Sequence, residues 1–298
     1  MASTIHYQAC PICASESISK LYVAKDHTVS GELFEVWRCV KCSGGFTQNV
    51  PDAATIGPYY AAESYVSHTD SDKGIINNIY HKVRRFSLLT KKKLVAKLVG
   101  NNTGTLLDIG AGTGAFVHTM QTGGWNVTGL EPDATAAQQA LIKYNIRLQS
   151  ANTLYTLEAH QFDAITMWHV LEHVHDLHGY FKRFGELLQS SGVLVIAVPN
   201  YTSTDAKMYG QNWAALDTPR HLYHFSPASM EALALKHGFT LVSKKAMWFD
   251  AFYVSMLTEQ HKSGSLLKAI LVGLWSNLTA LLDVNKCSSV IYAFKKSN

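Results

Sequence analysis

Along the middle of the chain, two patterns of apolar and polar positions follow each other repeatedly. One is typical of strands and the other of helices. Short apolar runs bounded by glycine, proline and polar residues predict buried strands, and apolar positions three and four residues apart predict helices. We predict strands at residues 105–110, 125–131, 145–149, 162–168, 192–198, 239–247 and 289–295. We predict helices at residues 114–122, 133–144, 176–189 and 227–237. This alternation predicts an α/β fold, with a parallel sheet covered by helices on both faces.

Two further helices are predicted outside this alternation. From Ile75 to Val99, lysines and arginines are interleaved with apolar positions. A nucleic-acid or membrane-surface contact is one interpretation of such a helix, and a solvated face is the other. Residues 265–282 are strongly apolar. A bilayer span needs about 20 predominantly apolar residues, and Lys268, Gly273 and Asn277 interrupt this run. We predict that this segment caps the site or joins two subunits of a homodimer, with a monotopic membrane contact as the alternative.

Four of the five cysteines lie near the amino terminus in two C-x2-C pairs. The pairs are Cys10 with Cys13 and Cys39 with Cys42, and alternating apolar residues between them suggest short strands. Two such pairs direct four thiolates at one metal ion, whereas a pair of disulfides is the competing interpretation. In a reducing compartment the spacing favours a structural zinc ion in a zinc ribbon.

Composition narrows the classes of function. The chain has 298 residues, of which 47% are hydrophobic, so it can bury a large core. Its net charge of +4 is too small to suggest a nucleic-acid partner. The first residues show neither a basic start nor an apolar run, so no secretory signal is visible and we expect a cytoplasmic protein.

A strand that runs directly into a glycine-rich turn marks the clearest candidate site. The run from Leu106 to Ile109 is followed by Gly110, Gly112 and Gly114 in a G-x-G-x-G spacing. Glycine lets a cofactor approach the backbone closely, and the spacing differs from the dinucleotide pattern G-x-G-x-x-G. Glu131 ends the next strand, where a carboxylate can accept hydrogen bonds from both ribose hydroxyls. The spacing therefore argues against an NAD-dependent oxidoreductase and for another nucleotide-type cofactor.

At this point the chain resembles the class I S-adenosylmethionine-dependent methyltransferases. Four blocks carry the resemblance: LLDIGAGTGAF (106–116), VTGLEPD (127–133), FDAITMWHVLEHVHD (162–176) and GVLVIAVPN (192–200). The resemblance implies a Rossmann-like sheet of seven strands. It also implies a cofactor site in which Glu131 holds the ribose, and Asn152 or its neighbours contact the adenine. The remaining implied cofactor-binding residues are Asp108, Gly110, Ala111, Gly112, Gly114 and Trp168. In such relatives the segment before the first strand folds over the cofactor, which places Tyr59, Tyr60 and Tyr65 near the site.

The loop after the fourth strand is the first candidate for chemistry. His169, Glu172 and His173 follow Trp168, and ligands of open α/β sheets bind at such strand ends. A histidine there can take a proton from the methyl acceptor. Alternatively, the three side chains bind a divalent ion that lowers the pKa of a hydroxyl. The loop resembles the E-x-x-E-H signature of quinone-type O-methyltransferases, which implies a metal, although His169 replaces the first glutamate. The alternative without a functional role is that Glu172 and the histidines of this loop face solvent.

A second cluster follows the fifth strand. Trp213, Asp217, Arg220 and His224 are predicted to bind the substrate, and His221 to orient or deprotonate its hydroxyl. The alternative is a structural pairing of Asp217 with Arg220 that locks the loop. The cluster resembles a subgroup of bacterial methyltransferases with an amino-terminal zinc ribbon.

We therefore predict a zinc ribbon at 1–50, a helical linker or lid at 51–102, and a methyltransferase domain at 103–298 with inserts at about 200–226 and 248–288. The predicted reaction moves a methyl group from S-adenosylmethionine to a small molecule, most simply to a hydroxyl oxygen. C-methylation of a nucleotide-linked sugar is the alternative acceptor chemistry. A non-catalytic protein that binds RNA or a membrane is the alternative from another class, and the intact glycine turn with Glu131 argues against it.

Overall fold

The computed structural model describes residues 3–61 and 75–297, with side chains described for 3–61 and 83–297. The chain forms two compact units. The first unit comprises Met1–Ala62, His169–His178 and Ala197–Tyr292, and the second comprises Glu63–Trp168, Gly179–Ile196 and Ala293–Asn298. The predicted division at residues 50 and 102 stays a prediction.

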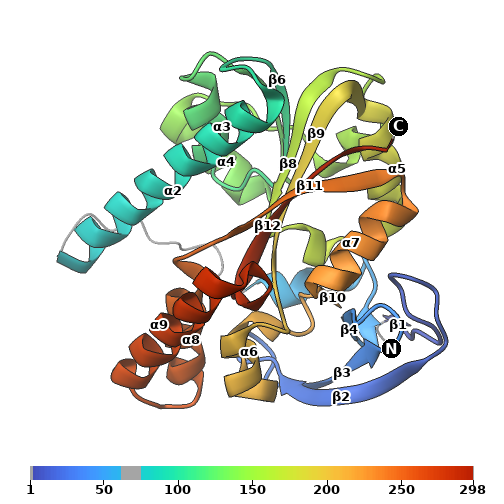
Figure 1. Cartoon of the computed structure of the whole chain (residues 1–298), viewed down its shortest axis with the longest axis vertical. Coiled ribbons are helices and arrows are strands. Elements are labelled where there is room, and N and C mark those ends of the chain that lie inside the picture. The colour runs from blue at the N-terminus through green and yellow to red at the C-terminus, as the bar shows by residue number, and fades with distance from the viewer. Residues whose placement is uncertain (1–2, 62–74, 298) are drawn as a thin grey trace. The chain divides into compact units, whose positions relative to one another are not determined.

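A parallel sheet forms the core of the second unit. β6 (Thr105–Ile109) pairs in parallel with β7 (Asn126–Leu130) on one side and with β8 (Phe162–Trp168) on the other. Leu106 and Leu107 of β6 are fully buried, as expected for a strand covered on both faces. The α/β class predicted from the sequence is confirmed (Figure 1).

The sheet has six strands in the described part of the chain, in the order β11-β12-β9-β8-β6-β7. The other three are β9 (Leu188–Pro199), β11 (Phe239–Ala246) and β12 (Ser289–Lys296). The predicted strand at 145–149 is wrong. Only an isolated bridge between Leu130 and Gln149 forms there, while the alternating Ile146 and Leu148 pack against β7 as a loop.

The helices predicted between the strands are present with small shifts of their ends. They are α3 (Ala115–Gln121), α4 (Ala134–Tyr144), α5 (Leu177–Leu187) and α7 (Pro227–Lys236). α5 ends earlier than predicted because β9 begins at Leu188. At the start of α4, Asp133 accepts a 2.7 Å hydrogen bond from the N–H of Ala136, which caps the helix. The basic helix before the sheet is α2 (Ile75–Val99).

An antiparallel sheet dominates the amino-terminal part of the first unit. Its strands β2 (Ile18–Lys25), β3 (Leu33–Cys39) and β4 (Gly45–Thr47) agree with the predicted ribbon. A fourth strand, β10 (Tyr223–His224), joins β4 from far along the chain. β1 (Thr4–Ile5) pairs with β5 (Val50–Pro51). The amino-terminal module is therefore built together with residues of the second predicted cluster.

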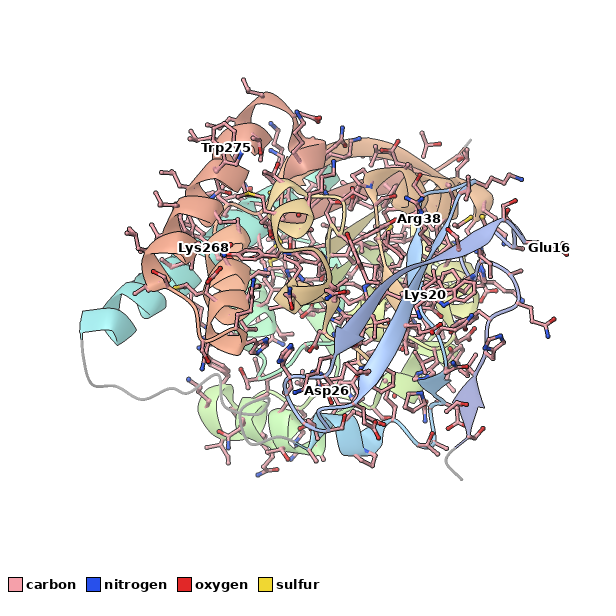
Figure 2. All side chains as sticks on the ribbon, turned by 90° about the horizontal axis from the view of Figure 1, so that it is seen from below. Glu16, Lys20, Asp26, Arg38, Lys268 and Trp275 are labelled. Atoms are coloured by element: carbon pink, nitrogen blue, oxygen red, sulfur yellow. The ribbon has the colours of Figure 1, made fainter. Side chains whose placement is uncertain are left out.

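Besides α7, the first unit contains three further helices in its described part. They are α6 (Thr204–Tyr209), α8 (Asp250–His261) and α9 (Leu266–Leu282). α9 is the helix predicted at 265–282, whereas α8 was not predicted. Ala269, Val272 and Ala280 of α9 are buried, while Trp275 and other large apolar side chains are exposed (Figure 2). Its role in joining subunits stays a prediction. Among the helices described, none has the length and hydrophobicity required to span a bilayer.

Short 3₁₀ helices connect these elements. They are η1 (Gly57–Tyr60), η2 (Ala151–Tyr155), η3 (Leu171–His173), η4 (Gly210–Asn212), η5 (Ala214–Leu216) and η6 (Val284–Lys286). η3 is important for the site because it carries Glu172 and His173 directly after β8.

Candidate functional site

The turn after β6 in the second unit has the backbone that its glycines permit. Gly110, Gly112 and Gly114 all have positive φ, at 71°, 53° and 77°. A Cβ on Gly114 would lie 2.8 Å from the Cβ of Ala140, so this glycine allows α4 to pack closely. A Cβ on Gly112 would meet no atom within 4 Å, so open space lies beside the turn. The turn thus combines a tight backbone with room for a ligand.

Glu131 is bound to this turn. Its Oε2 accepts a 2.7 Å hydrogen bond from the N–H of Gly112, and its Oε1 accepts a 2.9 Å bond from the N–H of Asp133. Burial raises the pKa of the carboxyl, although both N–H groups oppose this by stabilising the charged form. The carboxylate therefore lies at the turn, as the predicted ribose contact requires.

Asp108 is fully buried at the end of β6. The hydroxyl of Thr166 in β8 donates a 2.6 Å hydrogen bond to its Oδ1. Burial raises the pKa of Asp108 to about 7, and the charge of Lys91 opposes part of this effect. A carboxyl whose pKa lies near neutral pH can change its protonation state when a ligand binds.

The remaining predicted cofactor residues have different surroundings. Trp168 packs edge-on against Phe116, and Nζ of Lys91 lies 4.3 Å from the centre of its indole ring. Ala111 is buried. Asn152 is exposed in η2. None of these placements tests a cofactor contact, so their roles stay predictions.

Basic side chains of helix α2 contact other residues of the second unit, which its sequence pattern did not indicate. Its Arg84 donates a 3.5 Å hydrogen bond from Nη2 to Oγ1 of Thr113 in the glycine turn. Together with Lys91 over Trp168, this contact means that the basic face of α2 is not simply solvated. Of the three tyrosines predicted to line the site, Tyr65 lies outside the described residues.

The histidine loop lies in the first unit. His169 has a φ of 59°, and its Nε2 lies 3.0 Å from Oδ2 of Asp250 at the start of α8. Burial disfavours its charged form, but the charges of Asp250 and Glu172 outweigh burial and raise the pKa of His169 to about 10. His169 is therefore held as an imidazolium at neutral pH. Sequence reasoning missed Asp250 because α8 was not predicted.

Glu172 is 1% exposed, which is unusual for a carboxylate. Within the described part of the chain, neither carboxylate oxygen has a hydrogen-bond partner. Nδ1 of His169 lies 3.5 Å from Oε1, the distance of an ion pair rather than of a good hydrogen bond. Burial raises the pKa of Glu172, but His169, His221 and His173 outweigh it and leave the pKa below its usual value. The carboxylate is thus charged, buried and poorly paired.

His173 and His221 lie next to this carboxylate. One nitrogen of each ring and one oxygen of Glu172 all lie within 4.8 Å of one another. The two rings meet edge to face at 4.6 Å between centroids. Burial, and then the neighbouring His221, lower the pKa of His173 to about 4, so its ring is neutral. The structure therefore brings His221 to Glu172 and His173 from another loop.

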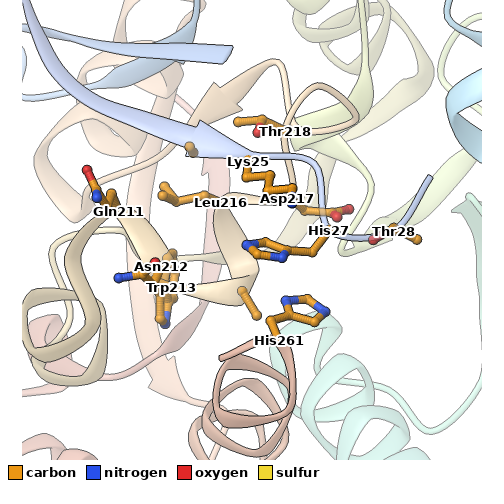
Figure 3. A pocket seen from close by; sticks show the side chains of 12 residues that line it. Lys25, His27, Thr28, Gln211, Asn212, Trp213, Leu216, Asp217, Thr218 and His261 are labelled. Atoms are coloured by element: carbon orange, nitrogen blue, oxygen red, sulfur yellow. The ribbon is translucent and has the colours of Figure 1, made fainter. Parts of the chain in front are cut away.

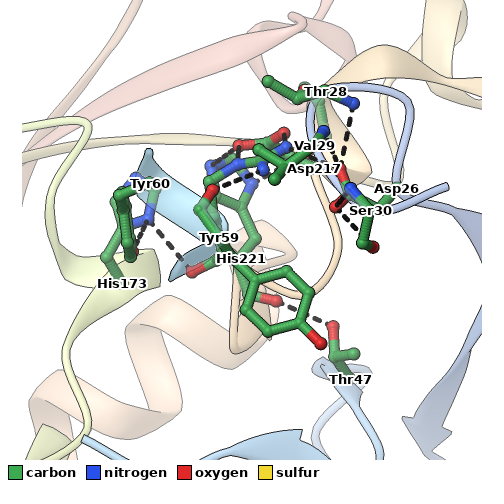
Figure 4. Close-up of polar contacts among 12 residues, drawn as sticks. Asp26, Thr28, Val29, Ser30, Thr47, Tyr59, Tyr60, His173, Asp217 and His221 are labelled. Carbon is green, nitrogen blue, oxygen red and sulfur yellow. Dashed lines mark hydrogen bonds and ion pairs between the residues drawn. The ribbon is translucent and has the colours of Figure 1, made fainter. Parts of the chain in front are cut away.

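Tyr60 also reaches this cluster. Its hydroxyl oxygen lies 3.1 Å from Nδ1 of His173 (Figure 4). Tyr60 belongs to the described part of the segment predicted to fold toward the site. Of the predicted catalytic residues, the structure thus groups Glu172, His173 and His221 with Tyr60, and pairs His169 with Asp250.

Arg220 is fully buried, and all three nitrogens of its guanidinium group donate hydrogen bonds. Its Nε donates a 3.0 Å hydrogen bond to Oδ2 of Asp217, and its Nη2 binds Oδ1 of the same carboxylate. Nη1 donates to the carbonyl of Tyr59 at 2.9 Å, and Nη2 to Oδ1 of Asp26 at 3.3 Å. The structural pairing considered for Asp217 and Arg220 is therefore present, with Asp26 as a partner that the sequence did not suggest.

The other predicted substrate residues are also tied into the unit. Nε1 of Trp213 donates a 2.8 Å hydrogen bond to the buried Asp205. Nε2 of His224 lies 2.9 Å from the hydroxyl of Thr47, which itself donates to the carbonyl of His221. Substrate contacts by Trp213 and His224 stay predictions.

A small cavity lies beside Trp213. Its volume is about 10 Å³, and His27 and His261 stack against each other in its lining (Figure 3). Such a volume holds about one water molecule, so this cavity is too small for a methyl acceptor.

The four amino-terminal cysteines converge. Sγ of Cys10 lies 3.7 Å from Sγ of Cys42, and Sγ of Cys13 lies 3.6 Å from Sγ of Cys39. All four sulfurs lie within 4.8 Å of one another and none forms a disulfide. Four thiolates on one tetrahedral zinc ion, each at about 2.3 Å, lie about 3.8 Å apart. The donor set and its spacing therefore fit zinc.

Comparison with known proteins identifies the family. Residues 80–244 match the family model described as a methyltransferase domain, which is more than half of the chain. The chain belongs to this family. The methyltransferase domain thus includes the glycine turn, Glu131 and the histidine loop. The family predicted from the sequence is confirmed, and the subgroup with a zinc ribbon stays a prediction.

Curated relatives match the same region. The ubiquinone biosynthesis O-methyltransferase of Azorhizobium caulinodans is 25% identical over 158 residues, which cover 49% of this chain and 62% of the relative. The protein of the same name from Psychrobacter arcticus is 29% identical over 153 residues, covering 45% of this chain and 58% of the relative. The chain thus spans about 60% of the length of these relatives.

Solved structures share the fold. Haemonchus contortus phosphoethanolamine N-methyltransferase 2, in complex with phosphomonomethylethanolamine and S-adenosylhomocysteine, is 17% identical with a TM-score of 0.51. The match covers 85% of this chain and 63% of that structure. At this identity the likeness concerns the fold of the methyltransferase domain alone.

Proposed function

We propose that this protein transfers the methyl group of S-adenosylmethionine to a hydroxyl oxygen of a small molecule. The observation that carries the proposal is the hydrogen bond between Gly112 and Glu131, which places a carboxylate beside an open glycine turn. Membership in the methyltransferase domain family supports it. The names of the curated relatives favour oxygen as the acceptor atom.

The residues of the turn suit the proposed cofactor. The backbone from Gly110 to Gly114 and the carboxyl of Asp108 would surround the methionyl part, and Glu131 would accept hydrogen bonds from the ribose hydroxyls. When bound, S-adenosylmethionine supplies a methyl group on a sulfonium, which an oxygen attacks in line. The protein accelerates such a substitution mainly by orienting the two reactants and excluding water.

The acceptor hydroxyl must lose a proton, and the cluster of Glu172, His173 and His221 is the candidate for promoting this loss. A neutral ring nitrogen can accept the proton directly. The same three groups can instead bind a metal ion that lowers the pKa of the hydroxyl. Arg220 acts indirectly in either case, because its bonds to Asp217 and Asp26 hold the loop that carries His221.

We also propose a structural zinc ion on Cys10, Cys13, Cys39 and Cys42. The support is the convergence of four thiols that form no disulfide. The metal would join the two C-x2-C segments and so stabilise the amino-terminal part of the first unit.

The decisive experiment is calorimetric titration with S-adenosylhomocysteine. We expect micromolar binding by the wild type and a loss of at least about tenfold in Glu131→Ala, since two ribose hydrogen bonds disappear. Glu158→Ala, an exposed acid in the same unit, is the matched control and should bind normally. NAD should not bind. Absence of S-adenosylhomocysteine binding by the wild type would contradict the proposal.

A transfer assay addresses the acceptor. With radiolabelled methyl donor and a panel of small hydroxyl compounds, we expect label in a methyl ether. His173→Gln should abolish turnover yet retain S-adenosylhomocysteine binding. Label appearing on carbon, with the same retained binding, would replace O-methylation by C-methylation.

A further inference from the structure

We propose that Glu172, His173 and His221 form a binding site for a divalent transition-metal ion such as Zn²⁺, separate from the four cysteines. The three side chains come from η3 and from the loop before β10, which are nearly fifty residues apart in the sequence. One ligand atom from each lies within 4.8 Å of the others, so small side-chain rotations let a single ion reach all three.

The carboxylate of Glu172 is the first reason. It is 1% exposed, and across the described residues neither of its oxygens accepts a hydrogen bond. A buried carboxylate in this state costs several kcal/mol unless a cation or hydrogen-bond donors compensate it. His169 at 3.5 Å compensates it only in part, because its Nε2 is engaged by Asp250. A metal ion between the three side chains would satisfy the carboxylate directly.

The orientation of the two imidazoles is the second reason. Nδ1 of His173 lies 3.0 Å from the carbonyl oxygen of Arg220, and Nδ1 of His221 lies 2.9 Å from that of Ala215. A carbonyl oxygen only accepts, so each Nδ1 carries a proton, and Nε2 is the nitrogen of each ring that can serve as a metal ligand. Nε2 of His221 also lies 3.9 Å from Oδ2 of Asp217. Histidines that bind metals are oriented in this way, with the second ring nitrogen bound to a carbonyl or carboxylate.

Hydrogen bonds also join η3 to the loop before β10 within the first unit. The N–H of Leu222 donates a 2.8 Å hydrogen bond to the carbonyl of Glu172, and His173 is bonded to the carbonyl of Arg220. Arg220 is itself held by Asp217 and Asp26. The ligands therefore rest on a preorganised frame, which lowers the cost of assembling a metal site.

This set differs from the one that the sequence suggested. His169 is paired with Asp250, and His221 takes the third position instead. Two imidazoles and one carboxylate favour zinc or iron(II) over magnesium or calcium, which prefer oxygen ligands. Three protein ligands leave a position for a hydroxyl oxygen. Metal binding stands on its own, whereas a role in lowering the pKa of the acceptor hydroxyl rests on the proposed function.

The test counts metal ions in the full chain. After incubation with zinc and removal of excess, elemental analysis should give two zinc ions per wild-type chain, and one per chain in Glu172→Gln and in His221→Gln. His175→Gln changes a histidine of the same loop outside the set and should keep two. A wild type with one zinc, or variants that keep two, would overturn the proposal.

Cobalt substitution and thermal unfolding provide readouts that do not depend on activity. Co²⁺ on the cysteines gives thiolate charge-transfer bands, whereas Co²⁺ on nitrogen and oxygen gives only weaker visible bands. His221→Gln should remove the second set and leave the first unchanged. Zinc added to protein that carries a single ion, on the cysteines, should raise the Tm of the wild type but not that of Glu172→Gln. Binding of S-adenosylhomocysteine by all variants separates a failure of this site from a failure of the proposed function.

Discussion

The N–H of Gly112 donates a 2.7 Å hydrogen bond to Oε2 of Glu131, which joins the turn after β6 to the end of β7. Gly112 and Gly114 of this turn have different surroundings. A Cβ on Gly112 would enter open space, while a Cβ on Gly114 would lie 2.8 Å from the Cβ of Ala140. We therefore expect ligand binding and folding to depend on different glycines of the same turn.

We predict that Gly112→Ala and Gly114→Ala separate these tasks. Both place alanine at positive φ, which costs about 1–2 kcal/mol. Gly114→Ala adds a steric overlap with α4 that costs about 1–3 kcal/mol more. Urea unfolding should rank Gly114→Ala as less stable, and calorimetry should show weaker S-adenosylhomocysteine binding by Gly112→Ala. Equal stability of the two variants would contradict the packing role of Gly114.

Asp108 should make stability depend on pH. Burial raises its folded-state pKa to about 7 from an unfolded value near 3.8. Between these values the folded state binds more protons, so its stability falls as pH rises, by about 1.4 kcal/mol per pH unit at most. Asp108→Asn removes this penalty and still accepts from Thr166. Urea unfolding at pH 5 and pH 8 gives the free energy of unfolding of both proteins. The value of the variant relative to that of the wild type should be higher at pH 8 than at pH 5. A pH-independent difference between the two would contradict the raised pKa.

Arg220 should be essential for the stability of the first unit. Arg220→Ala leaves Asp217 and Asp26 without their buried cation, which typically costs about 3–5 kcal/mol. Arg220→Lys keeps the charge but loses the planar fork, so we expect an intermediate loss. Arg38→Ala, at an exposed position of the same unit, should change the free energy of unfolding by less than about 0.5 kcal/mol. A loss in Arg220→Ala no larger than in Arg38→Ala would show that the network is dispensable.

Asp205 should anchor the loop that carries Trp213. Its buried carboxylate accepts hydrogen bonds from Trp213, Ser203, Ser276 and Ser288 at 2.7–2.8 Å. Asp205→Asn replaces one acceptor oxygen by a donor, so buried donors lose their partner at about 1–3 kcal/mol each. Lys207→Ala, exposed on the same helix, is the control. Thermal unfolding and Trp fluorescence should report the loss, and an unchanged Tm would refute the anchoring role.

Removal of the proposed structural zinc should destabilise the amino-terminal module. Treatment with a strong chelator, or the variant Cys42→Ser, should lower the Tm and weaken the near-UV circular dichroism, because the two C-x2-C segments lose the ion that would hold them together. Re-addition of zinc should restore the wild type but not the variant. A metal-free chain with an unchanged Tm, or one holding disulfides, would contradict the zinc assignment.

Local pattern predicted most of the sheet and its helices because their periodicity is a property of neighbouring residues. It failed at residues 145–149, where alternating apolar residues pack beside β7 with only one bridge. Alternation reports one buried face, but it does not report whether a partner strand has free hydrogen-bonding groups along its length. α8 was missed for a related reason, since its apolar residues do not follow one clear stripe.

The sequence by itself determined the glycine turn with its acid, the two cysteine pairs and the histidine loop after β8, because each depends on residues close together in the chain. Only the tertiary structure decided which of these residues meet. It pairs His169 with Asp250, joins Arg220 to Asp26, and brings His221 to Glu172 and His173. Burial then sets the pKa of each group, and burial results from packing between segments that no local pattern connects.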